Sequence, residues 1–135
     1  MKSLKLLFSL LLVFVVSSAF TLQDDEKKGG VYIAGVSASF SDSLVYFTEP
    51  IFVDSVQLQK KTDFLPERYQ YSTQLTDYMS AKYGLHHRTS FVLFNKNKAK
   101  LEKAIKKLKE KYKKSGKSQL KQVDPSFKFK KAVGY

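Results

Sequence analysis

The chain has 135 residues with 24 basic and 12 acidic side chains, a formal net charge of +12, and no cysteine. The lack of cysteine excludes disulfides, a thiol nucleophile, a cysteine metal site and a lipid-modified bacterial N-terminus. The charge is uneven, because residues 20–95 carry 7 basic and 9 acidic side chains, whereas residues 96–135 carry 15 and 3. This asymmetry points to an anionic partner or surface, and says nothing about the fold.

The chain begins in the order of a secretory signal peptide, with a basic start, the apolar run Leu6–Val16 and a small-residue ending at Ala19. This apolar stretch is shorter than the roughly 20 residues that span a bilayer. We therefore expect a secreted or periplasmic protein, with no transmembrane segment after cleavage and no lipid anchor. The predicted organisation is a signal peptide at 1–19, a polar leader at 20–30 and a single domain at 31–135.

Two strands joined by a turn are predicted after the leader. From Gly29 to Phe40 larger and smaller side chains alternate with a period of two, as on the two faces of a strand. Ser41 and Asp42 suit a turn, because their side chains bond to their own backbone. Residues 43–53 then complete a hairpin, which Pro50 interrupts.

A helix and a third strand are predicted next. Pro66 suits the first turn of a helix and Gly84 the position just past its end. Between them an apolar stripe recurs at steps of three and four residues, formed by Tyr71, Leu75, Tyr78, Met79 and Lys82. The strand at residues 87–94 is expected to be central in the sheet, because its end is apolar on both faces.

The C-terminal third predicts a lysine-rich helix and a last strand. Asn95 or Asn97 caps this helix, and its docking stripe is Leu101, Ala104, Ile105, Leu108 and Tyr112. Ser115 and Gly116 end it. Phe127 and Phe129 then alternate with lysines, which predicts an amphipathic strand at a sheet edge, where lysine discourages edge-to-edge pairing.

The element order β-β-α-β-α-β predicts an α+β fold. A hairpin followed by two crossovers most simply gives a two-layer sandwich, with about four mostly antiparallel strands and both helices on one face. About 100 residues can bury one core without staples.

The sequence contains no pattern that predicts catalytic residues, a metal site or a cofactor. His86 and His87 are adjacent, so in an extended chain their rings point to opposite faces, and no second ligand motif accompanies them. The serines near Asp42 lack a nucleophile elbow. The sequence therefore favours a non-enzymatic protein. The enzymatic alternative is a small secreted hydrolase or nuclease that uses His86, His87 and Arg88.

The lysine-rich helix favours association with an anionic component of the cell envelope, namely peptidoglycan, lipopolysaccharide or anionic lipid. Nucleic acid is disfavoured, because the chain is expected to be exported and has only two arginines, the residue suited to bidentate phosphate recognition. The alternative is that the basic face is only a solvated helix surface. The predicted binding residues are Lys100, Lys103, Lys107, Lys111, Lys114, Lys128 and Lys130.

Two stretches, SASFSDSLVYFTE at residues 37–49 and HRTSFVLFNK at residues 87–96, resemble segments of a family of small exported bacterial proteins of unknown function. The resemblance implies a setting in the cell envelope and assigns no site residues. The expected layers are also similar in form to the SPOR domain, a small exported module of a sheet and two helices that binds peptidoglycan glycan. That module has the order β-α-β-β-α-β, whereas the hairpin comes first here.

Overall fold

The computed structural model describes residues 29–133. The predicted signal peptide at 1–19 and the leader up to residue 28 lie outside the described residues. Gly30, the last residue of the predicted leader, is the first residue of strand β1.

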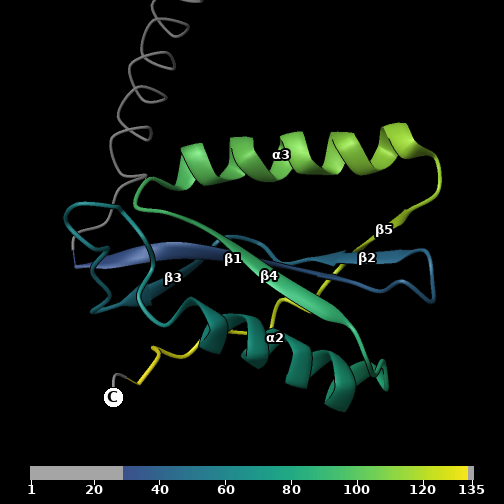
Figure 1. Cartoon of the computed structure of the whole chain (residues 1–135), viewed down its shortest axis with the longest axis horizontal. Coiled ribbons are helices and arrows are strands. Elements are labelled where there is room, and N and C mark those ends of the chain that lie inside the picture. Colours follow the sequence, from purple (N-terminus) through teal and green to yellow (C-terminus); the bar gives the residue numbers. More distant parts are fainter. Residues whose placement is uncertain (1–28, 134–135) are drawn as a thin grey trace, which may run out of the picture.

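Two helices and five strands make up the described part of the chain (Figure 1). Their order is β-β-β-α-β-α-β and the sheet is mostly antiparallel, so the predicted α+β class is confirmed. The elements are β1 (Gly30–Ala38), β2 (Leu44–Phe47), β3 (Ile51–Asp54), α2 (Arg68–Tyr83), β4 (Thr89–Asn95), α3 (Lys98–Ser115) and β5 (Gln119–Gln122).

Strand β1 lies at the centre of the sheet and pairs along both of its edges. One edge pairs with β4 over the whole length of that strand, and the other pairs with β3 in its first half and with β2 in its second. The chain between β2 and β3 leaves the ladder at Thr48–Pro50, where the backbone N–H of Gly35 donates to Thr48 Oγ1 at 2.8 Å. The predicted second strand is therefore two short strands, β2 and β3, which pair one after the other with the same edge of β1, so that the five strands fill four positions across the sheet. The break falls at Pro50, because proline has no N–H to donate to a neighbouring strand.

The last strand is not where the sequence predicts it. Strand β5 is Gln119–Gln122, parallel to β2 at the edge of the sheet. The predicted alternation is correct, since Phe127 and Phe129 are buried between exposed lysines. However, this segment packs against α2, and the amide of Gln74 replaces a neighbouring strand by bonding both the N–H and the C=O of Lys130 at 2.8 Å.

The prediction that both helices cover one face is wrong: α3 lies above the sheet and α2 below it (Figure 1). The crossover β3–α2–β4 runs across β1 in one direction, and β4–α3–β5 runs back across β1 and β2 in the other. Two crossovers of the same hand that run in opposite directions place their helices on opposite faces. Both helices would cover one face only if the two crossovers ran in the same direction, and the predicted two-layer sandwich is instead a three-layer one.

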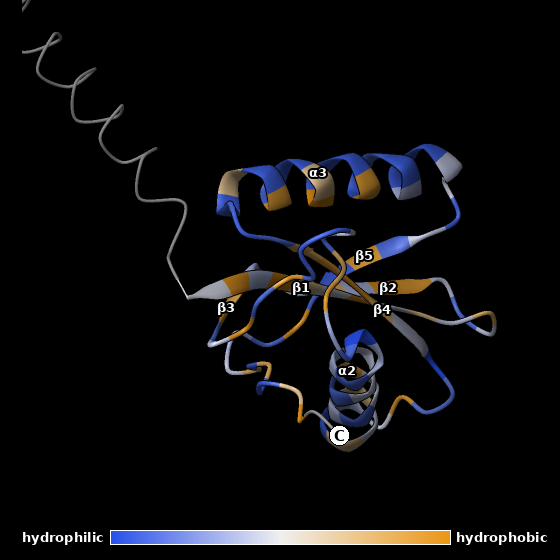
Figure 2. Ribbon diagram, turned by 60° about the vertical axis from the view of Figure 1, so that its left-hand side comes forward, coloured by the Kyte–Doolittle hydropathy of each residue, from blue (hydrophilic) through white to orange (hydrophobic). Residues whose placement is uncertain are grey.

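Two hydrophobic cores result, one on each side of the sheet, and β1 contributes to both. Val31 and Ile33 pack with Leu75 of α2, while Tyr32 and Val36 pack on the side of α3. Figure 2 shows apolar residues of α3 turned toward the sheet, with hydrophilic residues over the rest of the helix. Neither helix of the described part is long and apolar enough to cross a membrane.

Strand β4 is an edge strand, so its predicted central position is wrong. Its only pairing partner among the described residues is β1. The apolar residues on both of its faces are explained by the two helices, because Phe94 packs in the core below the sheet and Leu93 in the core above. A strand that is apolar on both faces therefore signals cover from both sides, whatever its position in the sheet.

Candidate functional site

Helix α3 carries the predicted binding residues and is fixed to the sheet by a narrow apolar seam. Asn97 caps its N-terminus, its side chain accepting from the N–H of Lys100 at 3.1 Å, and Gly116 ends it in the left-handed conformation. Leu101 and Ile105 are buried, and the predicted Leu108 and Tyr112 are half-buried against the same core. The remaining member of the predicted stripe, Ala104, is exposed.

Five of the predicted lysines form a continuous row along α3, which we call the lysine stripe: Lys100, Lys103, Lys107, Lys111 and Lys114. Their spacing of three or four residues places them side by side on one flank of the helix. All five are exposed. Within residues 29–133 the only ion pair closer than 4.0 Å joins Arg88 to Asp42, so no lysine of the stripe is paired with a carboxylate.

The opposite flank of α3 has a mixed character. Glu102, Lys106 and Lys109 line a shallow hollow of about 220 Å³ with the Thr48–Pro50 break in the sheet. The ammonium of Lys109 lies 5.3 Å from the centre of the Phe47 ring, so this lysine is used within the fold. Lys109 is therefore engaged within the fold, whereas each lysine of the stripe is exposed and has no carboxylate partner within residues 29–133.

Lys128 and Lys130 are exposed but do not join the lysine stripe. The phenylalanines beside them, Phe127 and Phe129, belong to the core on the α2 side of the sheet, whereas α3 covers the other side. The predicted binding face is thus divided into two surfaces separated by the sheet. This division follows from the crossover directions, which the sequence pattern does not specify.

Arg88, one of the three residues of the enzymatic alternative, has a structural role. Arg88 is buried, and its guanidinium donates to Ser37 Oγ at 3.0 Å, to the carbonyl oxygens of Ser37 and Leu44, and to Asp42 Oδ2 at 2.8 Å. The pKa of Asp42 is lowered by the hydrogen bond that its Oδ1 accepts from the N–H of Leu44 at 2.9 Å, and it is lowered further by Arg88. Arg88 therefore joins the start of β4 to the β1–β2 hairpin.

The two histidines are exposed and lie outside this network. His86 Nδ1 shares a hydrogen bond with Ser80 Oγ at the end of α2, and neither His86 nor His87 lines any of the three hollows described in this section. No group of three or more potential metal ligands is found among the described residues. The structure thus does not bring the predicted enzymatic residues together at a site.

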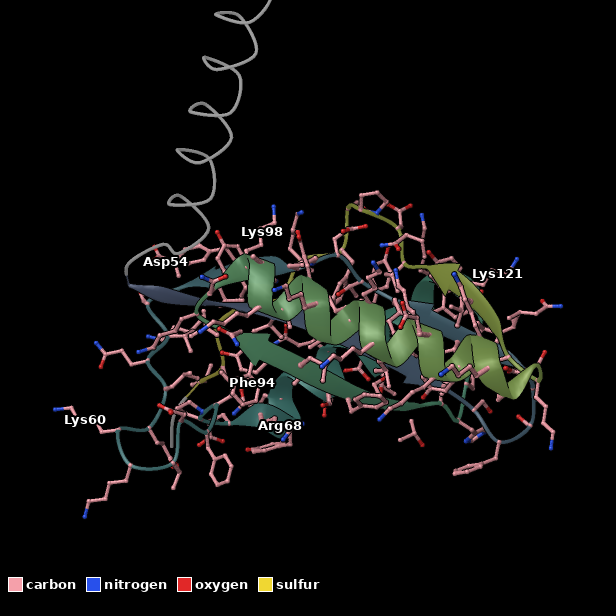
Figure 3. The ribbon with its side chains drawn as sticks, turned by 90° about the horizontal axis from the view of Figure 1, so that it is seen from above. Asp54, Lys60, Arg68, Phe94, Lys98 and Lys121 are labelled. Atoms are coloured by element: carbon pink, nitrogen blue, oxygen red, sulfur yellow. The ribbon has the colours of Figure 1, made fainter. Side chains whose placement is uncertain are left out.

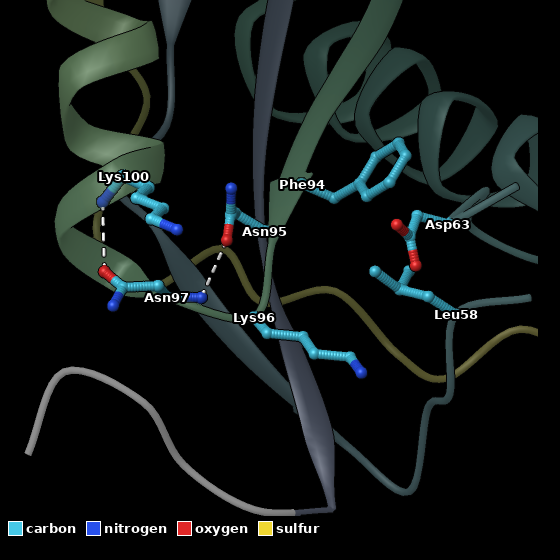
Figure 4. Close-up of a pocket in the computed structure, with 7 residues that line it drawn as sticks. All are labelled: Leu58, Asp63, Phe94, Asn95, Lys96, Asn97 and Lys100. Carbon is cyan, nitrogen blue, oxygen red and sulfur yellow. Dashed lines mark hydrogen bonds between the residues drawn. The ribbon is translucent and has the colours of Figure 1, made fainter. Parts of the chain in front are cut away.

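A hollow of about 320 Å³ lies at the N-terminal end of α3 (Figure 4). Its polar groups are used to start the helix, because Asn95 accepts from the N–H of Asn97 and Asn97 accepts from the N–H of Lys100. Lys96 and Asp63 bring opposite charges to its wall. This end of α3 is therefore a helix cap and offers no uniform charge to a ligand.

A third hollow, of about 380 Å³, lies between the β1–β2 turn and the C-terminal end of α3. Phe40 in the turn borders it and is fully exposed, at 104 % of its reference area. Sequence reasoning placed Phe40 in the strand and missed its exposure. The available signal was its position in Ser-Phe-Ser-Asp-Ser, where one aromatic residue stands among small polar ones.

Comparisons with protein-family models, with curated proteins and with solved structures find no match to this chain. The resemblance of residues 37–49 and 87–96 to a family of exported bacterial proteins therefore stays a prediction from the sequence.

Proposed function

We propose that this protein is an exported, non-enzymatic domain that associates with an anionic component of the cell envelope through the lysine stripe of α3. The observation that carries the proposal is that five adjacent lysines are exposed on one flank and none is paired with a carboxylate. A helix surface that only keeps a protein dissolved mixes acidic and basic residues at i,i+4 spacing. Within α3 only Glu102 and Glu110 are acidic.

Lysine suits diffuse attraction to a densely charged surface. Its ammonium is a compact, strongly hydrated charge on a flexible stem, whereas a specific anion site is usually built from arginine forks. Each lysine close to an anionic surface contributes about 1 kcal/mol, and five on one flank can act together. Peptidoglycan, lipopolysaccharide and anionic lipid all present such a surface, and a periplasmic or secreted protein would meet them.

The test is co-sedimentation with isolated wall sacculi and with anionic lipid vesicles at rising salt. Replacing four lysines of the stripe, Lys103, Lys107, Lys111 and Lys114, by glutamate should lower retention at least tenfold on the component that binds. The matched control replaces four exposed lysines elsewhere: Lys60, Lys61, Lys128 and Lys130. It changes the net charge equally and should retain most of the binding.

Two outcomes contradict the proposal. If the control variant loses as much binding as the stripe variant, retention depends on net charge alone and the stripe is only a solvated surface. Retention that does not weaken with salt would also exclude it, because attraction between exposed charges is screened over about 8 Å at physiological ionic strength.

A further inference from the structure

The β1–β2 turn presents an aromatic side chain to solvent at one end of the molecule. Phe40 is fully exposed, whereas the other exposed aromatic residues among residues 29–133, Phe64 and Tyr69, are 60 % and 58 % exposed. A single exposed apolar residue needs no explanation by itself. The surroundings of Phe40 supply the explanation in this case, because they combine a fixed turn, an apolar hollow and unpaired lysines.

The turn is fixed by hydrogen bonds at its base and along its length. Ser39 Oγ and Ser41 Oγ lie 2.9 Å apart, and Asp42 accepts from the N–H of Leu44. The guanidinium of Arg88 donates to Asp42 Oδ2 at 2.8 Å and so neutralises this carboxylate, which is the only one in the turn. Phe40 is therefore held away from the core by a braced loop.

The hollow beside Phe40 is lined by both apolar and polar residues. Its volume is about 380 Å³, with Val45, Phe91 and Tyr112 among the apolar residues and Asp42, Lys117 and Ser118 among the polar ones. Side chains of this kind accept an aliphatic chain or a ring and leave a charged head group at the edge. The hollow therefore continues the apolar surface that Phe40 begins.

The C-terminal end of α3 lies beside the turn. The N–H of Gln119 donates to the carbonyl of Ser43 at 2.7 Å, which joins the turn to the residues that follow the helix. Figure 1 shows the β1–β2 turn and the end of α3 on the same side of the molecule, and in Figure 3 Lys98 and Lys121 lie toward opposite ends of the domain. Lys114, Lys117 and Lys121 are exposed at this end, and none of them is in an ion pair within the described residues.

We infer that this end of the molecule, which we call the docking end, binds the surface of an anionic lipid bilayer, with Phe40 inserted among the lipids and Lys114 and Lys117 at the head groups. The inference rests on the proposed function and narrows its partner to lipid. Peripheral membrane binding combines an apolar insertion with basic residues that attract anionic head groups. Phenylalanine has an apolar phase to enter in a bilayer, which a hydrated glycan surface does not offer.

A protein partner is disfavoured by area. A stable protein interface buries about 800 Å² on each side, and one phenylalanine contributes roughly 150–250 Å². The exposed apolar surface at the docking end is one ring and the mouth of a hollow, which is too little for such an interface but enough for insertion.

End-on docking makes the two ends of the lysine stripe unequal. Lys114 lies fourteen positions after Lys100, which is about 21 Å along a helix that rises 1.5 Å per residue. That distance is more than twice the screening length of about 8 Å at physiological ionic strength. When Phe40 touches the bilayer, Lys114 and Lys117 lie closest to the head groups, and screening weakens the attraction of Lys100 and Lys103 to them.

The experiment measures partitioning onto vesicles of phosphatidylglycerol and phosphatidylcholine, with pure phosphatidylcholine as the neutral reference. Phe40→Ser should lower the partition coefficient about tenfold or more, and Lys114→Glu with Lys117→Glu should lower it similarly. The matched control Phe64→Ser should stay within about twofold of the wild type. Lys100→Glu with Lys103→Glu, at the far end of the lysine stripe, should lower the partition coefficient less than the Lys114 and Lys117 pair does. All of these positions are exposed, so the fold should be preserved, which far-UV circular dichroism checks.

The failures of the two proposals can be distinguished. If the wild type binds sacculi but not anionic vesicles, the lipid inference is wrong and the proposed function stands. If it binds neither, both are wrong. If it binds vesicles but Phe40→Ser has no effect, or the two pairs of lysine changes are equally damaging, the molecule binds flat through the whole stripe and the docking end is not the contact.

Discussion

Replacing Arg88 by methionine tests whether the buried guanidinium fixes the β1–β2 hairpin. The side chain of Arg88 is 1 % exposed and satisfies four acceptors, three of them on Ser37 and Leu44. Methionine fills much of the volume but donates no hydrogen bond. At about 1 kcal/mol for each of three acceptors left without a donor, Arg88→Met should cost about 3 kcal/mol.

The salt bridge adds less to this sum than its short distance suggests. Asp42 keeps 34 % of its side chain in solvent, so its carboxylate is rehydrated when Arg88 is removed. Exposed ion pairs contribute about 0–1 kcal/mol. Lysine in place of Arg88 should therefore destabilise nearly as much as methionine, because it keeps the charge and lacks the planar fork that reaches several acceptors at once.

Urea unfolding followed by far-UV circular dichroism measures these changes, since the chain has no tryptophan. A loss of about 3 kcal/mol moves the midpoint by roughly 1–3 M at an m-value of about 1–3 kcal/mol/M. Arg68→Met is the matched control: Arg68 also donates to a backbone carbonyl, that of Val92 at 3.0 Å, but it is exposed and should cost no more than about 1 kcal/mol. If Arg88→Met costs no more than this control, the buried network does not hold the hairpin.

Two further predictions concern the centre of the sheet and the turn. Gly35→Ala would place a methyl group 2.6 Å from a Leu75 methyl and 3.1 Å from the Phe129 ring. Overpacking of this kind costs about 1–3 kcal/mol of stability, which a lower thermal unfolding midpoint would show. An unchanged midpoint would mean that α2 can move away from β1. The folded-state pKa of Asp42 lies below its usual value, so its stabilisation should be complete above the unfolded-state pKa of about 4 and lost as the pH falls through the folded-state pKa. Asp42→Asn should therefore lower the urea midpoint at neutral pH, and the difference from the wild type should shrink as the pH falls below about 4. A difference that stays constant would show that the carboxylate charge is not responsible.

The local structure follows from the sequence because short-range chemistry determines it. Asn97 caps α3 and Gly84 ends α2 with a positive φ of 65°, as the helix-capping patterns predict. Tyr71, Leu75 and Met79 of the predicted stripe are buried at steps of four residues and Tyr78 is half-buried, whereas Lys82 is exposed. Each of these features depends on residues within one or two turns of each other, so one chain without an alignment is enough to predict it.

Long-range placement does not follow in the same way. The direction of each crossover decides which face a helix covers, and no residue within α2 or α3 encodes that direction. Phe127 and Phe129 show the same difficulty. Their alternation with lysines fits an edge strand of the sheet, and it fits equally well the observed segment, which is bonded to Gln74 of α2. The alternating pattern specifies burial on one side but not the identity of the neighbour.

The same crossovers that separate Lys128 and Lys130 from the lysine stripe create the docking end. Because β5 pairs in parallel with β2, beginning opposite Leu44, the chain that leaves α3 must reach the sheet beside the β1–β2 turn. The pairing of the strands therefore brings Lys117 to the same hollow as Phe40, although 76 residues lie between the two in the chain. Arg88 fixes the same turn from the start of β4. One crossover thus places Arg88 where it fixes the turn that carries Phe40, and the next brings Lys117 to the same end of the molecule, a combination that composition alone could not reveal. Comparing the vesicle binding of the Lys114→Glu, Lys117→Glu variant with that of the Lys100→Glu, Lys103→Glu variant measures whether this placement matters.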